Sequence, residues 1–337
     1  MPTIPNVLAR VAAWLDRVAF HPASLPDDLV TGIALTAPVI AGLIIFKVAA
    51  AETLVVALAI GGAAQIVFGW LWRRGETKRP TSPLMAALFG VALVGVGSTI
   101  SISIEIAVVA VALELLRARF VPAIRAQTGL FAYAVVAAIT RGAQAIYINP
   151  ASDRPFADPI STWYNFFTPA AAPIDPIRLY VGNVPGPVFA TSLMAVIIGA
   201  AWLAYARRVS LVVLVTFLAG ALVPIYLWHW DYLFQLDSGP TWFVAALVLA
   251  DRRLLPDSWA VRPVIGLAAG ILAIGLRRFG HGIEGAFITV ALIQALLAMI
   301  TVLFWVGSTM LERWKRDRRL KQREANLRVV KSQQRAG

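Results

Sequence analysis

The sequence predicts an all-α integral membrane protein with about ten transmembrane helices. Three observations support this fold class. The chain of 337 residues is 59% hydrophobic and only 14% charged, with a mean hydropathy of +0.75. Several apolar stretches approach the ~20 residues that a helix needs to cross a bilayer. Basic connections follow every second apolar stretch, as expected when successive loops lie on opposite sides of a membrane.

The composition also excludes several classes of protein. There is no cysteine, which excludes disulfides and thiolate-ligated iron–sulfur clusters within this chain. The three histidines, His21, His229 and His281, lie outside the middle of the apolar stretches, so no haem and no metal site are expected. From Glu312 to Gly337 there are ten Lys and Arg residues against three Asp and Glu, so much of the net charge of +12 lies in one tail. A basic tail is typical of a cytoplasmic flank, so membrane lipid is an expected partner and nucleic acid is not.

Residues 1–28 are expected to form an interfacial segment. Within residues 7–18, valine and leucine fall on one helical face, and Arg10 and Arg17 fall on another. This pattern is typical of a helix that lies on the membrane surface. Docking to a partner subunit is the alternative.

The apolar segments form two groups of five, separated by a polar stretch at residues 149–187 that is expected to be an outer-face loop. The first group occupies residues 29–148 and the second residues 188–307, and a basic cytoplasmic tail follows at 308–337. The expected spans are Leu29–Ala50, Thr53–Trp72, Leu84–Val96, Ile100–Leu116, Leu130–Ile148, Val188–Ala206, Leu211–His229, Thr241–Ala250, Val264–Leu276 and Gly285–Val306.

The third segment of each group is too short to cross a bilayer, and the fourth is short as well. Both third segments start at a Ser/Pro-containing stretch, PTSPLMAALFGVAL in one group and DSGPTWFVAALVL in the other. Because five crossings is an odd number, the second group must be inverted relative to the first. Inverted repeats with broken helices place a binding site near the midplane of the membrane. We therefore expect two inverted five-helix repeats with both termini in the cytoplasm, and a tilted ordinary span is the alternative for each short segment.

Three stretches then resemble a known family. They are GNVPGPVFATSLMAVIIGAAWLAYARR (182–208), FQLDSGPTWFVAALVLADRRLLP (234–256) and GLRRFGHGIEGAFITVALIQAL (275–296). In this order and spacing the chain resembles the integral membrane subunits RnfD of Rnf electron-transport complexes and NqrB of the Na⁺-translocating NADH:quinone reductase.

The resemblance implies a subunit of the bacterial inner membrane that binds FMN or another flavin and passes electrons across the membrane, with possible coupling to Na⁺ or H⁺ translocation. It implies FMN-binding and iron–sulfur subunits as partners. No self-contained catalytic constellation is present, so the chain is at most one subunit of a redox-driven translocase. The alternatives are a channel or permease for small polar solutes such as urea, and a scaffold subunit without cofactor.

In the family, one FMN is attached through a phosphoester to a Thr between the fifth and sixth spans. The corresponding loop here reads ADPISTWYNFFTPAAAP, and Tyr164 occupies the acceptor position. Thr162 lies two residues earlier, and Thr168, which Pro169 follows, would require an insertion. Thr162 and Thr168 are therefore the two candidate attachment residues.

The resemblance also marks residues at the starts of two spans. Thr191 and Ser192 match the Thr-Ser entry into the sixth span. Ser238, Gly239 and Thr241 begin the short segment of the second half, where backbone N–H groups could bind a phosphate or the edge of an isoalloxazine. An N-cap and turn is the alternative role for these three residues.

Four charged residues complete the set of candidates. Asp251 ends the second short segment and either belongs to the site or pairs with the arginines beside it. Arg277 and Arg278 fall on the outer side, against the positive-inside rule, and Arg278 either holds a flavin phosphate as part of this arginine pair or forms a structural clamp with Glu284. Glu105 in the fourth span is a candidate for an ion pathway, because ionisable residues within spans are costly. Contact with water at the membrane surface is the alternative for Glu105.

Overall fold

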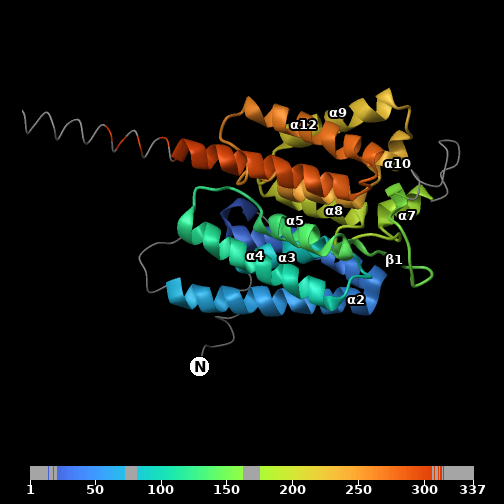
Figure 1. The fold of residues 1–337 in the computed structure, drawn as a ribbon, viewed down its shortest axis with the longest axis horizontal. Helices are drawn as coiled ribbons and strands as arrows, with labels where there is room; N and C mark the ends of the chain where they lie inside the picture. The colour runs from blue at the N-terminus through green and yellow to red at the C-terminus, as the bar shows by residue number, and fades with distance from the viewer. Residues whose placement is uncertain are drawn as a thin grey trace, which may run out of the picture. The chain divides into compact units, whose positions relative to one another are not determined.

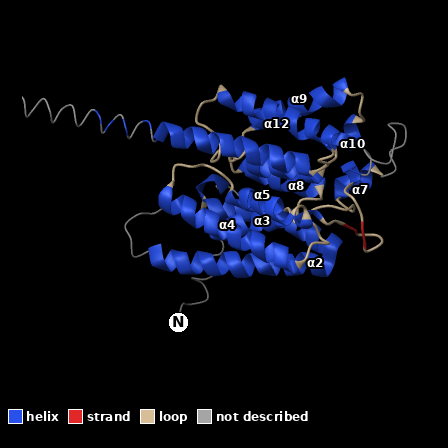
Figure 2. Ribbon diagram, in the orientation of Figure 1, coloured by secondary structure: helices blue, strands red, loops and turns tan. Residues whose placement is uncertain are grey.

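A computed structural model describes most of the chain, which is mostly helical (Figure 2). The interfacial segment expected at the N-terminus and the basic tail lie almost entirely outside the described residues. The chain divides into two units, residues 1–294 and 295–337, and their boundary falls within the last helix, Glu284–Trp305. The described residues are 14, 18, 21–72, 82–161, 175–305, 307, 310, 312 and 314.

The helices agree with the expected order of apolar segments, and one short hairpin joins β1 (Ile148–Asn149) to β2 (Arg154–Pro155). Within the described residues, two apolar helices have the length and composition to cross a membrane, Asp27–Gly69 and Glu284–Trp305, and further apolar helices are shorter. The helices are α2 (Asp27–Trp72), α3 (Pro83–Ala92), α4 (Ile100–Phe120), α5 (Thr128–Thr140), α7 (Pro176–Val181), α8 (Leu193–Tyr205), α9 (Leu211–Leu227), α10 (Tyr232–Leu236), α11 (Gly239–Trp242) and α12 (Val261–Gly275), with the π-helix η3 (Phe243–Leu249) and the 3₁₀ turns η1 (Pro22–Ser24), η2 (Ala143–Ala145) and η4 (Leu276–Phe279).

Helix α2 folds back on itself at Lys47, where the backbone leaves the helical region (φ 48°, ψ −115°). Gly32 lies against Met85 (3.7 Å from an added Cβ to Cε), and Gly61 lies against Leu84 of the same turn of α3. In a straight helix these two glycines would be about 44 Å apart at 1.5 Å per residue. They can reach one turn of α3 only if the halves of α2 are antiparallel, which agrees with two separate spans.

The two short segments, α3 and the continuous pair α11–η3, meet in the middle of the bundle. The rings of Phe89 in α3 and Phe243 in η3 have centroids 5.9 Å apart. Ser82, which precedes α3, and Arg253, which follows η3, line the same cavity. Helix α3 therefore starts at the end of the bundle where η3 finishes, and the two short helices enter from opposite ends.

These ends are named here by a residue that marks each one. The Asp27 end contains Asp27, Glu114 and Arg253, and the Arg277 end contains Gln235 and Arg277.

Both short helices finish in backbone pairing with the segment that precedes another helix. After α3, the N–H of Val188 donates to the carbonyl of Val94 (2.8 Å). After η3, the N–H of Ser210 donates to the carbonyl of Ala250, and that of Arg252 to Arg208 (both 2.8 Å). Carbonyls at helix ends lack intrahelical partners, and such pairing satisfies polar backbone that would otherwise be costly in lipid.

The two halves of the chain pack together through corresponding helices. The indole N–H of Trp202 in α8 donates to the carbonyl of Val30 in the first half of α2 (2.9 Å). The ring of Tyr133 in α5 meets that of Phe287 in the last helix edge-on, with centroids 5.6 Å apart. The first span thus contacts the sixth, the fifth contacts the tenth, and the two short segments contact each other.

Glycines allow close packing of α9 and α12, which lie side by side (Figure 1). Added Cβ atoms at Gly220 and Gly270 would each collide with a backbone carbonyl of the other helix. Small residues let two helix backbones approach closely in a membrane, where lipid supplies little hydrophobic drive for association.

Replacement of Gly270 by Ala is expected to lower the stability of the protein by about 1–3 kcal/mol, because the new methyl would overlap Phe217 and Ala221. Gly62→Ala is the matched control, since nothing lies within 4 Å of its added Cβ. That change should be neutral or stabilise the helix by up to ~1 kcal/mol. Thermal unfolding in detergent measures both, and equal effects would contradict this packing.

Candidate functional site

At the Arg277 end, a fully buried guanidinium holds the start of α11. Arg277 is 1% exposed and donates through Nη1 to the carbonyl (2.8 Å) and Oε1 (2.6 Å) of Gln235. Its Nη2 donates to Oγ1 of Thr241 (2.6 Å), and that hydroxyl donates to Oγ of Ser238 (2.9 Å). The candidate residues Ser238 and Thr241 are therefore joined to Arg277, one of the two arginines that the positive-inside rule marks as out of place.

The other candidates of this region lie beside the same helix start. Gly239 lies directly against the backbone carbonyl of Thr191, where a Cβ would not fit. Ser192 caps α8 by accepting a hydrogen bond from the N–H of Ala195 (3.3 Å). The structure thus brings Thr191, Ser238, Gly239 and Thr241 together at one helix start, with Ser192 next to Thr191 in the chain.

The space beside these residues is nevertheless small. The cavity lined by Thr191, Ser238 and Gly239 has a volume of about 20 Å³, enough for about one water molecule. In this conformation the side chains are packed against one another, so the arrangement holds the short helix in place and leaves no room for an isoalloxazine ring.

The loop before the candidate attachment residues is anchored at the same end. Asp158 is buried, and its carboxylate accepts hydrogen bonds from the N–H of Ile160 (3.0 Å) and from the N–H (3.1 Å) and hydroxyl (2.5 Å) of Ser161. Burial raises the pKa of Asp158, and the bonds from Ser161 oppose that rise. Thr162 and Thr168 themselves lie outside the described residues.

The structural clamp expected between Arg278 and Glu284 does not form among the described residues. Oε1 of Glu284 instead accepts hydrogen bonds from the hydroxyl of Tyr133 (3.1 Å) and from Nε2 of Gln144 (3.3 Å). The exposed guanidinium of Arg278 lies 4.9 Å from the ring centroid of Trp228. The arginine that faces the interior is its neighbour, Arg277.

Glu105 is exposed on α4, beside exposed apolar residues such as Ile104 and Val108. Its side chain therefore points away from the packed interior of the described chain. His229 and His281 belong to no group of three potential metal ligands among the described residues.

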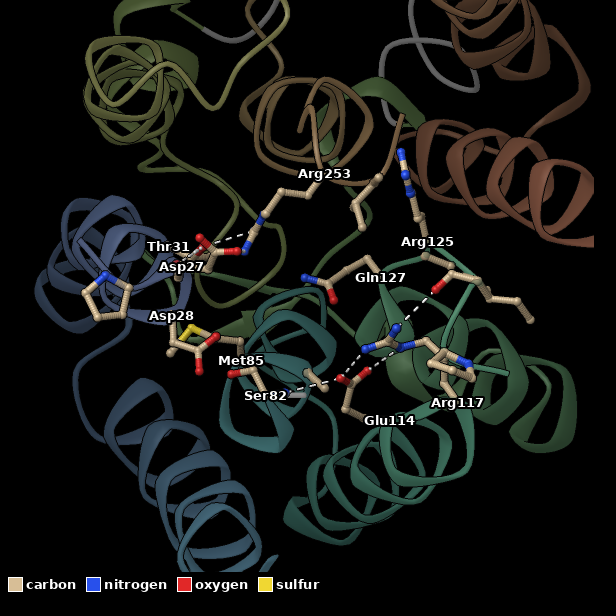
Figure 3. A pocket seen from close by; sticks show the side chains of 16 residues that line it. Asp27, Asp28, Thr31, Ser82, Met85, Glu114, Arg117, Arg125, Gln127 and Arg253 are labelled. Atoms are coloured by element: carbon tan, nitrogen blue, oxygen red, sulfur yellow. Dashed lines mark hydrogen bonds and ion pairs between the residues drawn. The ribbon is translucent and has the colours of Figure 1, made fainter. Parts of the chain in front are cut away.

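The Asp27 end contains a cavity of about 530 Å³, far larger than the one beside Thr191 (Figure 3). Helices α2, α3 and α4 of the first half form its wall, together with the loop that follows α4 and with Arg253 and Leu254 of the loop that follows η3 in the second half. Charged and polar groups predominate among the labelled side chains, and Met85 and Leu254 add apolar surface. The charged lining residues are Asp27, Asp28, Glu114, Arg117, Arg125 and Arg253.

One wall of this cavity is a charge pair within α4. Glu114 is 5% exposed and accepts hydrogen bonds from Arg117 at both carboxylate oxygens (2.7 Å from Nη2 to Oε1, 3.0 Å from Nε to Oε2). Oε1 also accepts from the N–H of Ser82 (3.2 Å), and Oε2 from the hydroxyl of Thr128 (3.0 Å). A buried carboxylate is tolerable only when it is paired and hydrogen-bonded in this way, so Glu114 holds the start of α3 against α4 and α5.

The opposite wall joins the end of η3 to the start of α2. Asp251 is 3% exposed and accepts hydrogen bonds from Nη2 (2.5 Å) and Nε (2.9 Å) of Arg253. Nη2 of Arg253 also reaches the hydroxyl of Thr31 (3.1 Å), and Arg208 forms an ion pair with Asp27. Burial lowers the pKa of Arg253, but the bonds and charge of Asp251 outweigh that effect and raise it, so this arginine stays charged. The expected pairing of Asp251 with an adjacent arginine is therefore present, and it lies at the wall of the cavity.

Apolar helices, two short helices from opposite ends and buried charge pairs are features of an integral membrane protein. The chain belongs to the NQR2, RnfD, RnfE family, whose model matches residues 29–305. None of the curated proteins is a significant match. The chain is thus a membrane subunit of the Rnf/Nqr type, from a family of multi-subunit electron-transport complexes that contain other membrane subunits.

Sequence reasoning missed the pair of Glu114 and Arg117, and it did not show which of the two marked arginines, Arg277 or Arg278, is buried. For Glu114 and Arg117, a signal was present, because opposite charges three residues apart lie on one helical face within a span. For Arg277, no such signal existed, since Arg277 and Arg278 are adjacent and only the 3₁₀ turn η4 decides which of them is buried.

Arg277→Ala is expected to destabilise the protein by about 3 kcal/mol, because it leaves buried acceptors on Gln235 and Thr241 without donors. Arg154→Ala, at an exposed arginine, is the control and should change stability by less than ~0.5 kcal/mol. Thermal unfolding in detergent compares them, and a similar loss in both variants would refute a structural role of the buried guanidinium.

Proposed function

We propose that this chain is the electron-carrying membrane subunit of an Rnf/Nqr-type complex and that it holds a flavin in the cavity at the Asp27 end. The observation that carries this proposal is the cavity itself, about 530 Å³ of space between the two halves of a chain from this family. Ligand cavities for small molecules usually have volumes of ~300–1,000 Å³. The site at the other end is far smaller.

The residues present fit a flavin. An isoalloxazine ring has two apolar faces and an edge of hydrogen-bond donors and acceptors. Met85 and Leu254 supply apolar surface, while Thr31, Ser82 and Gln127 supply polar groups (Figure 3). When bound, a flavin would supply one- and two-electron transfer, and the chain's own groups would hold it and exclude water.

We further propose that the two halves are inverted repeats. In support, the spans that correspond in the two halves contact each other, and α3 and α11–η3 run in from opposite ends with Phe89 against Phe243. The positive-inside rule assigns the Asp27 end and both termini to the cytoplasm of a bacterial inner membrane, because basic connections cluster there.

A second carrier at the Arg277 end would complete a path across the membrane. The anchored loop at Asp158 leads directly to the candidate residues Thr162 and Thr168, beside which a second flavin, held without a covalent bond, would lie at the outer face. Electrons would pass from peripheral FMN-binding or iron–sulfur subunits on one side to those on the other. Coupling to Na⁺ or H⁺, with Glu105 as one candidate group, forms part of the same hypothesis.

The rival function, a channel or permease for small polar solutes, is disfavoured by the centre of the bundle. Phe89 and Phe243 are 2% and 0% exposed and pack against each other between the two ends. A polar solute would have to displace both rings to pass. Flux of urea into liposomes by protein that contains no flavin would support this rival. A protein that shows no urea flux and contains no flavin would support the scaffold role.

Met85→Trp is expected to abolish non-covalent flavin binding, because the indole would fill the cavity that Met85 lines. The measurement is flavin fluorescence released from the purified complex by denaturation, expressed per chain. Met194→Trp is the control, since Met194 is 40% exposed on α8 and lies outside this cavity. Equal flavin release from both variants would contradict binding at the Asp27 end.

Covalent flavin is measured separately as fluorescence of the denatured band on a gel. Because Tyr164 replaces the expected acceptor, the wild-type band is expected to show no flavin fluorescence. A fluorescent band that disappears in Thr162→Val or Thr168→Val would contradict this expectation and would locate the bond.

A further inference from the structure

An apolar groove of about 700 Å³ runs along the outer surface of α9 at the Arg277 end. Its floor is a stripe of residues at helical spacing, Ala219, Leu222, Val223 and Tyr226, and Tyr232 at the start of α10 lines it as well. These side chains are open to the surroundings, with Val223 40% and Tyr226 79% exposed. Any boundary lipid can cover a flat helix face, whereas a groove between two elements can hold one acyl chain in a defined position.

A row of aromatic rings in contact connects this groove to a cation. Trp230 lines the groove, and its ring centroid lies 4.9 Å from that of Trp228. Trp228 also contacts Arg278, whose guanidinium lies 4.9 Å from the centroid of the Trp228 ring. Stacking on an aromatic face holds a guanidinium in position without neutralising its charge.

Arg278 differs from the other arginines that the structure fixes in place. Arg117, Arg125 and Arg253 each form an ion pair with a carboxylate, whereas the salt bridges among the described residues leave Arg278 without one. Asp231 lies close in sequence to the aromatic row, but its carboxylate caps α10 by accepting a hydrogen bond from the N–H of Phe234 (2.9 Å). The groove therefore ends near an ordered positive charge that is available to an anion.

We propose that this groove binds one anionic phospholipid, with an acyl chain along the stripe on α9 and the phosphate on Arg278. The apolar walls suit the acyl chain. Tryptophan and tyrosine are the residues that favour the headgroup level of a membrane. Arginine binds phosphate through two parallel hydrogen bonds. A helix of another subunit would also fit apolar walls, but it would have to bring a carboxylate to the same place. This site is independent of the flavin proposed at the opposite end.

The test is lipid binding to the purified, delipidated complex, measured by native mass spectrometry with phosphatidylglycerol and phosphatidylcholine of identical chains. The wild type should bind phosphatidylglycerol more tightly than phosphatidylcholine. Arg278→Gln should weaken the phosphatidylglycerol affinity by roughly tenfold, the loss expected for one charge-assisted contact. Arg154→Gln, at another exposed arginine, is the matched control and should leave the affinity unchanged.

A second variant tests the acyl chain. Val223→Trp fills the groove without touching Arg278 and should weaken binding of both lipids. Equal affinities of wild type and Arg278→Gln would overturn the proposal, as would equal affinities for the two lipids, because either marks ordinary boundary lipid. The chain has no cysteine, so Val223→Cys can be cross-linked specifically in the native membrane. Efficient cross-linking to another protein subunit would also overturn the proposal, and modification by a lipid-borne reagent would support it.

Discussion

The fold depends on the contact between two short helices that enter the bundle from opposite ends. Neither α3 nor α11–η3 is long enough to cross a membrane, so each leaves non-helical backbone within the bundle. Such backbone is stable in lipid only when its polar groups are satisfied inside the protein. The pairing after α3 and after η3 meets this requirement, and the packing of Phe89 on Phe243 fills the space between the two helices.

Buried charges then set how open each end is. At the Arg277 end, one guanidinium binds three acceptors and closes the space around the start of α11. At the Asp27 end, the arginines are paired with carboxylates on separate walls, Glu114 with Arg117 and Asp251 with Arg253. Because each pair is satisfied within its own wall, the walls need not collapse on each other, and a cavity remains between them.

The sequence predicted the order of the apolar segments and the two short ones, because hydrophobic runs and Ser/Pro stretches reveal them, and it marked Thr191, Ser238 and Thr241 as candidates without predicting that they lie together. It could not predict that this group leaves almost no space, since cavity volume depends on packing such as that of Gly239 on Thr191. It marked Arg277 and Arg278 together as out of place but did not show that Arg277 is the buried one. Burial of Arg277 follows from the local turn, which hydrophobic periodicity does not report.

The most direct test of this arrangement is the sidedness of single cysteines in the otherwise cysteine-free chain. Arg119→Cys and Arg252→Cys mark the Asp27 end, and Arg154→Cys and Arg178→Cys mark the Arg277 end; all four positions are exposed. A membrane-impermeant maleimide added to sealed vesicles should label one pair of positions directly. It should label the other pair only after the vesicles are opened. Labelling of Arg154→Cys and Arg252→Cys from the same side would contradict short helices that enter from opposite faces.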